Sequence, residues 1–190
     1  MTAPSPPYWP DHERVGLVTV DDVWAAVSLP AEWAPIVLAI LGGLSGPVWT
    51  DPGLTHWLWP VAPGGAGDWP DLTPVGVMRH GPGDMVLVPG SIGHNGVAWV
   101  RQPTSGRWFT HAALLRDAVE FILGPLGEAV ALGPVTVCRY CAAPIRCGVL
   151  IDSFQSLSGP GRDTYACPSC FRDTVGGGAR PLHTVRRVAR

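Results

Sequence analysis

Four of the five cysteines in the chain fall into two Cys-x-x-Cys pairs, CRYC at residues 138–141 and CPSC at residues 167–170. In a reducing compartment, such paired motifs most often hold zinc. Each pair makes a tight turn that directs two sulfur atoms at one ion, and two turns complete a tetrahedral site. Because four thiolates leave no open position for water or a substrate, the zinc site is predicted to be structural. The predicted ligands are Cys138, Cys141, Cys167 and Cys170.

The 25 residues between the two motifs are predicted to form a β-hairpin. The segment GVLIDSFQSL is followed by SGPGRDTYAC, and Gly159–Gly161 provides the turn between the two strands. This insert is slightly longer than the usual spacing of about 15–20 residues in zinc ribbons. We therefore predict a zinc ribbon over residues 137–174.

The remaining sulfur and the nearest histidine leave alternatives to this ligand set. Cys147 is the fifth cysteine, and because an apolar run follows it we predict a small buried residue at the start of a strand. His183 could replace one of the four sulfurs, although it follows the glycine run at 176–178. A redox role for Cys138 and Cys141 is disfavoured, because no thioredoxin-like strand and helix surround the motif.

Charge is distributed unevenly along the chain. The net charge is −2, but residues 1–134 carry five arginines against twelve acids, whereas residues 135–190 carry eight arginines against three aspartates. A basic segment joined to an acidic body suggests an anionic partner such as DNA or RNA, with a solvated surface as the alternative. Tyr140, Tyr165 and Phe171 would offer stacking faces or form a miniature core. The arginines predicted to meet phosphates are Arg139, Arg146, Arg162, Arg172, Arg186 and Arg187.

The composition indicates one ordinary domain with a small appendage. The chain has 190 residues, of which 46 % are hydrophobic and 15 % charged, and its 24 glycines and 21 prolines imply many turns. Glycine and proline interrupt every apolar run, so no membrane span is expected. The first residues lack the pattern of a signal peptide, and we expect a cytoplasmic protein with a disordered arm over residues 1–11.

The body preceding the ribbon is predicted to be an α+β domain with a mixed or mainly antiparallel sheet. We expect a buried strand at 15–20 and a helix within 29–44 that ends at Gly42 and Gly43. A second helix is expected at 111–123, closed by Gly124, followed by a linker at 126–136. Tryptophans 49, 57, 59 and 99 are interpreted as core or sheet-surface residues. Further strands are expected at 46–50, 55–62, 75–80, 84–91 and 96–100.

The segment GVMRHGPGDMVLVPGSIGHNGVAWV at 76–100 resembles the bifunctional DNA primase/polymerase domain of the archaeo-eukaryotic primase superfamily. That family has a strand, a Pro-x-Ser-type turn, a glycine and then a strand that ends in an aromatic residue. The matching positions here are Pro89, Ser91, Gly96 and Trp99. The resemblance covers roughly residues 12–125, and it implies that LTHWLW carries the catalytic histidine, His56, and that VTVDDVW carries a metal-binding acid, Asp22.

The chain departs from that family at its acidic motifs. The family's first motif has two acids flanking one residue, whereas Asp21 and Asp22 are adjacent and would point to opposite faces of a strand. The third acid is replaced by Met78. Two-metal phosphoryl transfer needs several carboxylates around ions about 4 Å apart. We therefore predict a shortened, non-catalytic relative, in which Asp21 and Asp22 form a strand-end turn and His56 is an ordinary strand residue.

Two functions from different classes remain open on the sequence alone. The first is a zinc-containing nucleic-acid-associated protein that uses its ribbon and its basic tail, residues 175–190. The second is an adaptor that binds another protein through the Trp-rich body and the ribbon, with no nucleic acid involved. Lysine chemistry is excluded because the chain has no lysine, which removes the Walker A, Schiff-base and kinase mechanisms.

Overall fold

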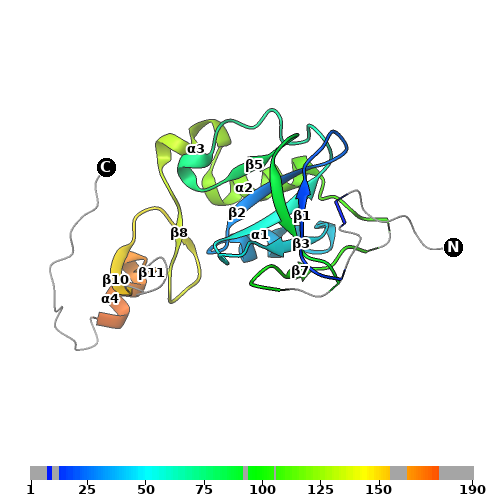
Figure 1. The fold of residues 1–190 in the computed structure, drawn as a ribbon. Helices are drawn as coiled ribbons and strands as arrows, with labels where there is room; N and C mark the ends of the chain where they lie inside the picture. Colours follow the sequence, from blue (N-terminus) through cyan, green and yellow to red (C-terminus); the bar gives the residue numbers. More distant parts are fainter. Residues whose placement is uncertain (1–7, 10–12, 92–93, 105, 155–161, 176–190) are drawn as a thin grey trace. The chain divides into compact units, whose positions relative to one another are not determined.

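The computed structural model describes residues 8–9, 13–91, 94–104, 106–154 and 162–175. The chain divides into two compact units, a body over Met1–Pro134 and a smaller unit over Val135–Arg190 (Figure 1). Both units combine helices with antiparallel strands, which confirms the α+β prediction. Among the residues that the structure describes, no helix combines the length and the hydrophobicity needed to cross a membrane.

The centre of the body is a five-stranded antiparallel sheet in the order β5-β2-β4-β3-β7. β4 is predicted by its alternating aromatics and pairs with β2 along its whole length, from Ala25 opposite Val61 to Pro30 opposite His56. Among the described strands, β5 pairs with β2 alone and therefore forms an edge of the sheet. The bounds are β2 Ala25–Pro30, β3 Val48–Thr50, β4 His56–Val61, β5 Met78–His80 and β7 Trp99–Arg101.

Strand β2 is absent from the sequence prediction, although it lies inside the sheet. Its sequence, AAVSLP, starts with two alanines and ends in a proline, and both residue types are depleted in strands. Pairing with a strand on each side nevertheless buries Val27 and Leu29 completely. Tertiary contacts thus override a weak local preference.

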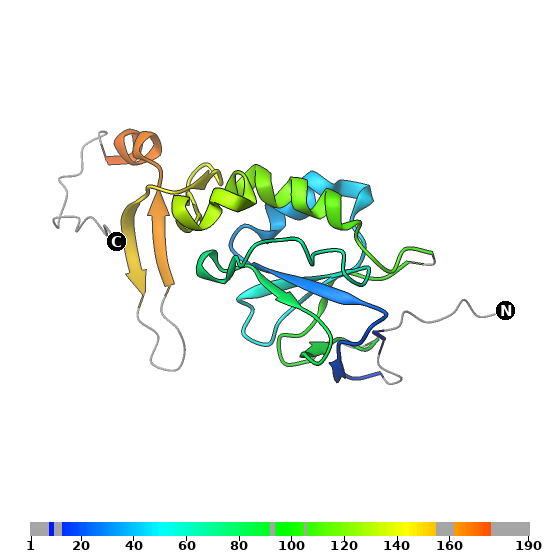
Figure 2. The ribbon, with the colours of Figure 1, turned by 90° about the horizontal axis from the view of Figure 1, so that it is seen from above.

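Helices α1, Ala34–Leu41, and α2, Ala112–Leu123, pack against each other on one face of the sheet (Figure 2). Pro35 is tolerated because it lies in the first turn of α1, where its missing N–H has no intrahelical partner. Helix α1 ends at Gly42, whose φ of 51° favours glycine, and the 3₁₀ helix η1 follows at Gly42–Leu44. Both helices confirm the sequence prediction.

Strands β1, Gly16–Thr19, and β6, Met85–Val88, form a separate two-stranded antiparallel sheet that contributes to a hydrophobic cluster on the opposite face of the central sheet. Tyr8 lies in this cluster with 0 % of its surface exposed, and its hydroxyl donates to the Trp108 carbonyl at 2.7 Å. The ring of Trp9 stacks on Trp99 at 5.4 Å. The prediction of a disordered arm over 1–11 is therefore wrong at residues 8 and 9, because aromatic burial anchors them in the core.

The predicted linker at 126–136 is also wrong for most of its length. Residues Leu126–Leu132 form helix α3, which buries Leu126 and Ala129. Helix α3 contacts α2 and the 3₁₀ helix η2, Thr73–Val75. Its apolar positions thus complete the core of the body, and Gly133, with φ of 82°, ends the helix.

The described residues of the second unit form two antiparallel strand pairs and a helix. β8, Thr136–Val137, pairs with β9, Pro144–Ile145, and β10, Val149–Phe154, pairs with β11, Arg162–Ala166. The second pair confirms the hairpin predicted between the cysteine motifs, while the predicted turn Gly159–Gly161 lies outside the described residues. Helix α4, Pro168–Val175, was not predicted.

Candidate metal centre

The four predicted zinc ligands come together in the second unit. Their sulfur atoms all lie within 4.8 Å of one another. Cys138 follows β8 and Cys167 follows β11, while Cys141 lies in the turn after β8 and Cys170 in the first turn of α4. The backbone N–H of Arg139 donates to the Tyr165 carbonyl at 2.8 Å, which ties the first motif to the strand that leads into the second.

The spacing of the sulfurs suits a tetrahedral thiolate site. Cys141 Sγ and Cys167 Sγ are 3.9 Å apart. Two sulfurs that each lie about 2.3 Å from a tetrahedral zinc ion would be about 3.8 Å apart. The four cysteines can therefore hold one metal ion, and a set of four thiolates is the ligand chemistry of structural zinc.

Backbone N–H groups stabilise the charged form of the sulfurs. The N–H of Cys167 donates to Cys138 Sγ at 3.3 Å, and the N–H of Cys170 donates to Cys167 Sγ at 3.5 Å. Hydrogen bonds from the N–H groups of Cys141 and Cys167 lower the pKa of Cys138 to about 6. The hydroxyl of Ser169, 3.1 Å from Cys167 Sγ, lowers the pKa of Cys167.

The fourth ligand, Cys170, differs from the others. Hydrogen bonds with the side chains of Cys167 and Cys141 favour its protonated form and raise the pKa of Cys170 to about 12. A divalent cation at the centre of the cluster would favour the thiolate form of all four cysteines.

Cys147 does not belong to the cluster and is exposed. The prediction of a buried residue at a strand start is wrong, because β9 ends at Ile145 and β10 begins only at Val149. Cys147 lies in the bend between these two strands. His183, the alternative ligand, lies outside the described residues.

The arginines predicted to bind phosphate are placed unevenly. Arg139 and Arg172 are exposed and Arg146 is half-buried, while Arg186 and Arg187 lie outside the described residues. Arg162 lies in β11. Residues 135–154 and 162–175 together contain four arginines and three aspartates, which gives a net charge of +1. The remainder of the +5 in this unit comes from residues 176–190.

The exposed aromatic residues of this unit are Tyr140 and Phe154. Tyr140 lies between two ligands and has 51 % of its surface exposed, whereas Tyr165 and Phe171 are half-buried. Phe154, at the end of β10, has 67 % exposed. The sequence analysis did not identify Phe154 as an exposed aromatic residue. Its place two residues after Asp152, on a half-exposed strand, is the signal that could have identified it.

The two residues predicted as catalytic are not brought together. Asp22 is exposed in the turn before β2, where Asp21 accepts the N–H of Val23 at 2.9 Å and forms the predicted strand-end turn. His56 pairs with Pro30 at the far end of β2, and its Nε2 lies 3.2 Å from the Gly76 carbonyl. The six residues of β2 separate the two ends by about 16 Å.

His80 ends β5, within the strand predicted at 75–80, and is half-buried. Its Nε2 forms a short hydrogen bond with Ser28 Oγ, one of the buried polar groups of the body. Burial lowers the pKa of His80, the nearby Asp84 opposes this effect, and His56 adds to it. The sequence did not predict the Ser28–His80 hydrogen bond, because this bond depends on strand β2, which was not predicted.

No family model, no curated protein and no solved structure matches the chain. The resemblance to the primase/polymerase family therefore stays a prediction that rests on its quoted residues.

Proposed function

We propose that the second unit is a zinc ribbon, folded around one structural zinc ion, that binds single-stranded nucleic acid. The observation that carries the zinc assignment is the convergence of four sulfur atoms within 4.8 Å. Thiolate ligation requires reducing surroundings, such as the cytoplasm. With four protein ligands around the ion, the metal has no open position and takes no part in chemistry.

Exposed side chains on and beside the cysteine turns support a nucleic-acid surface. Arg139 and Tyr140 are both exposed between Cys138 and Cys141, and Arg172 is exposed on α4. Aromatic rings that stand free of the core provide platforms on which unpaired bases stack, while arginines meet the phosphates. Bases are free to stack in this way only in single strands, which is why we propose single-stranded nucleic acid as the ligand.

The test is binding of labelled single- and double-stranded DNA by the whole chain across a salt series. We expect single strands to bind more tightly, with a salt dependence equivalent to about three to six phosphate contacts. Arg139→Gln should reduce the slope by about one contact, whereas Arg14→Gln, at an exposed position in the body, should leave it unchanged. Absence of binding at low salt would refute the proposal.

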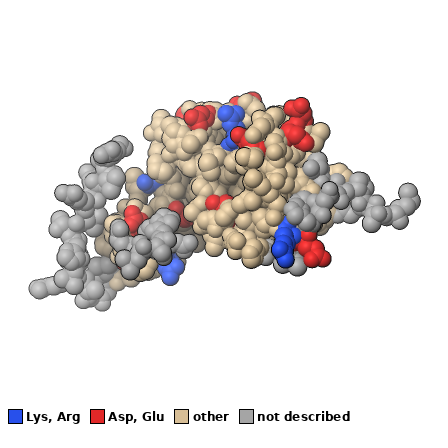
Figure 3. All heavy atoms as spheres, in the orientation of Figure 1, with Lys and Arg blue, Asp and Glu red and all other residues tan. Residues whose placement is uncertain are grey.

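A protein adaptor is the second candidate, and a specific observation favours it. The described part of the ribbon has a net charge of only +1, and it exposes Leu150 and Phe154 on one strand. Among the residues coloured in Figure 3, the basic side chains on the face drawn stand singly. An apolar strand surface without excess charge suits a protein partner. If this candidate is correct, Phe154→Ser should abolish partner capture, and the wild type should bind no DNA at low salt.

For the body we propose a primase/polymerase-like scaffold without nucleotidyl transfer. Its support is the separation of Asp22 from His56 along β2 and the presence of Met78 at the third acidic position. A primer-extension assay with Mg²⁺ or Mn²⁺ should show no incorporation by the wild type. Incorporation that is lost in Asp22→Asn would contradict this assignment.

A further inference from the structure

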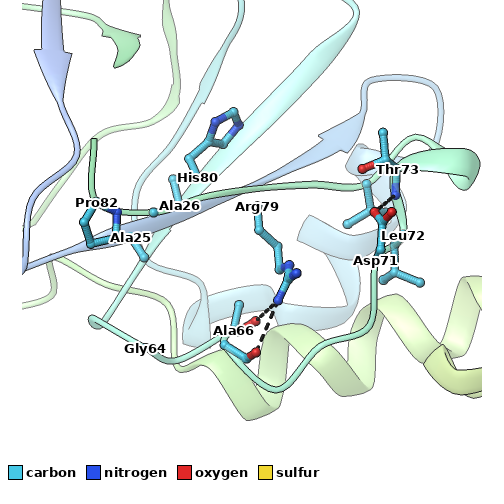
Figure 4. A pocket seen from close by; sticks show the side chains of 13 residues that line it. Ala25, Ala26, Gly64, Ala66, Asp71, Leu72, Thr73, Arg79, His80 and Pro82 are labelled. Carbon is cyan, nitrogen blue, oxygen red and sulfur yellow. Dashed lines mark hydrogen bonds between the residues drawn. The ribbon is translucent and has the colours of Figure 1, made fainter. Parts of the chain in front are cut away.

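A pocket of ≈ 370 Å³ opens beside the edge strand β5 in the body (Figure 4). This volume falls in the lower part of the range for small-molecule sites, about 300–1,000 Å³. The lining comes from the start of β2, the loop before η2 and the end of β5. Its apolar part consists of buried side chains, which are Ala26, Ala66, Leu72 and Val77.

The loop at 64–67 holds the guanidinium of Arg79 in place at this pocket. Nη1 of Arg79 donates to the carbonyls of Ala66 and Gly67 at 3.1 and 3.3 Å (Figure 4). A Cβ on Gly65 would lie 2.9 Å from the Ala112 side chain, so the loop needs glycine to adopt this path. Only one of the two terminal nitrogens of Arg79 is used in these contacts, which leaves donors for a ligand.

Asp71 supplies the opposite charge in the same pocket. Its Oδ1 accepts the N–H of Thr73 at 3.0 Å, which lowers the pKa of Asp71 and keeps it ionised; Arg79 adds a smaller effect in the same direction. Both side chains line the pocket, and no ion pair joins them in the described part of the chain. The ion pairs found in the described part of the chain join Arg116 to Asp68 and Glu120.

A pocket with a positioned cation, a positioned anion and an apolar wall matches one class of ligand. We propose that this pocket binds a small zwitterion, namely an α-amino acid with an apolar side chain. The carboxylate of the ligand pairs with Arg79, its ammonium group pairs with Asp71, and its side chain packs on Leu72 and Val77. Guanidinium–carboxylate contacts of this kind are the stronger class of hydrogen bond. A ligand with a single charge would leave Arg79 or Asp71 without a partner and would bind less tightly.

The test uses L-leucine as the probe and the whole ¹⁵N-labelled chain. Amide resonances of Gly64, Gly65, Gly67 and Thr73 should shift saturably with leucine at millimolar concentration. Two analogues of the same shape each lack one charge, 4-methylpentanoate and 3-methylbutylamine. Both should bind at least about tenfold more weakly, the equivalent of about 1.4 kcal/mol. Arg79→Gln and Asp71→Asn should each cause a loss of similar size.

Matched controls separate recognition from misfolding. Arg14→Gln and Asp117→Asn alter exposed charges that do not line the pocket, and they should leave leucine binding unchanged. Because Arg79 and Asp71 are themselves exposed, their variants should keep the wild-type spectrum outside the pocket. The proposal is overturned if leucine causes no saturable shift up to about 10 mM. It is also overturned if the singly charged analogues bind as tightly as leucine, or if Arg79→Gln binds leucine normally.

Discussion

The sulfur atoms of Cys141 and Cys167 lie 3.9 Å apart, although 26 positions separate the two residues along the chain. Between them run β9 and the β10–β11 hairpin, so the folding of that insert determines whether the two halves of the site meet. The metal site and the fold of the second unit therefore depend on each other. A module this small has too little core to fold well without such a link.

Replacing Cys141 by serine should abolish stoichiometric metal binding and unfold the second unit, because metal binding supplies folding free energy in such sites. Cys147→Ser is the matched control, since Cys147 is exposed and lies outside the cluster. Elemental analysis should find about one zinc per chain in the wild type and the control, and much less in Cys141→Ser. Equal zinc contents in all three proteins would contradict the assignment.

Zinc affinity should rise with pH, because zinc binds thiolates and displaces protons. The pKa of Cys170 is raised to about 12, so this thiol releases its proton on binding throughout the neutral range. The pKa of Cys138 is lowered to about 6, so below that pH a further proton competes with the metal and affinity should fall more steeply. Competition with a chelator from pH 5 to 9 would measure both regimes. An affinity independent of pH would exclude thiolate ligation.

The four-cysteine site was predictable because its signal is local, whereas the other sites depend on contacts between distant segments. Two residues separate the members of each cysteine pair, and a turn suffices to place them. The Ser28–His80 hydrogen bond instead requires β2 and β5 to pair across 52 positions. The Arg79 pocket needs the same pairing together with a glycine loop. β2 has the composition of a loop or a helix start, so its partners could not be foreseen.

The wrong predictions for the N-terminal segment and for helix α3 have a related cause. Tyr8 lies in a proline-rich stretch with no periodicity, and only the cluster that contains Trp24 and Trp49 explains its burial. Helix α3 is seven residues long and is stabilised by its contacts with α2 and η2 rather than by its own length. The local sequence pattern predicts neither segment, because the conformation of both depends on burial against the rest of the body.

Tyr8→Ala should destabilise the body by about 3–5 kcal/mol, the usual cost of removing a buried aromatic side chain. Tyr8→Phe keeps the ring and loses only the hydrogen bond to the Trp108 carbonyl, so it should cost about 1 kcal/mol. Urea unfolding monitored by tryptophan fluorescence would measure both values. If Tyr8→Ala unfolds at the wild-type urea concentration, the N-terminal segment does not contribute to the core.

Acidification should weaken the body through His80. Burial lowers the pKa of His80, so the folded state favours the neutral ring. The resulting stability is fully present above the unfolded pKa of about 6.5 and is lost as the pH falls through the lower folded pKa. His80→Gln should therefore flatten the fall in stability below about pH 6.5, and Asp84 and His56 are the charged neighbours that modulate it. His94→Gln, at an exposed position, should leave the profile unchanged.

Tyr140→Ala should weaken binding of single-stranded DNA by about 1–3 kcal/mol, because it removes one stacking platform, and it should leave the salt slope unchanged. Phe121→Ala is the matched control, since Phe121 is 72 % exposed on α2 in the other unit. Fluorescence anisotropy with a labelled oligonucleotide at fixed salt would compare the two variants. Tyr140 lies between Cys138 and Cys141, so zinc content must be measured alongside to show that the turn is intact. A loss of DNA affinity confined to Tyr140→Ala, with zinc retained, would assign the contact to the ribbon. An equal loss in both variants would mean that the exposed aromatic side chains bind DNA nonspecifically.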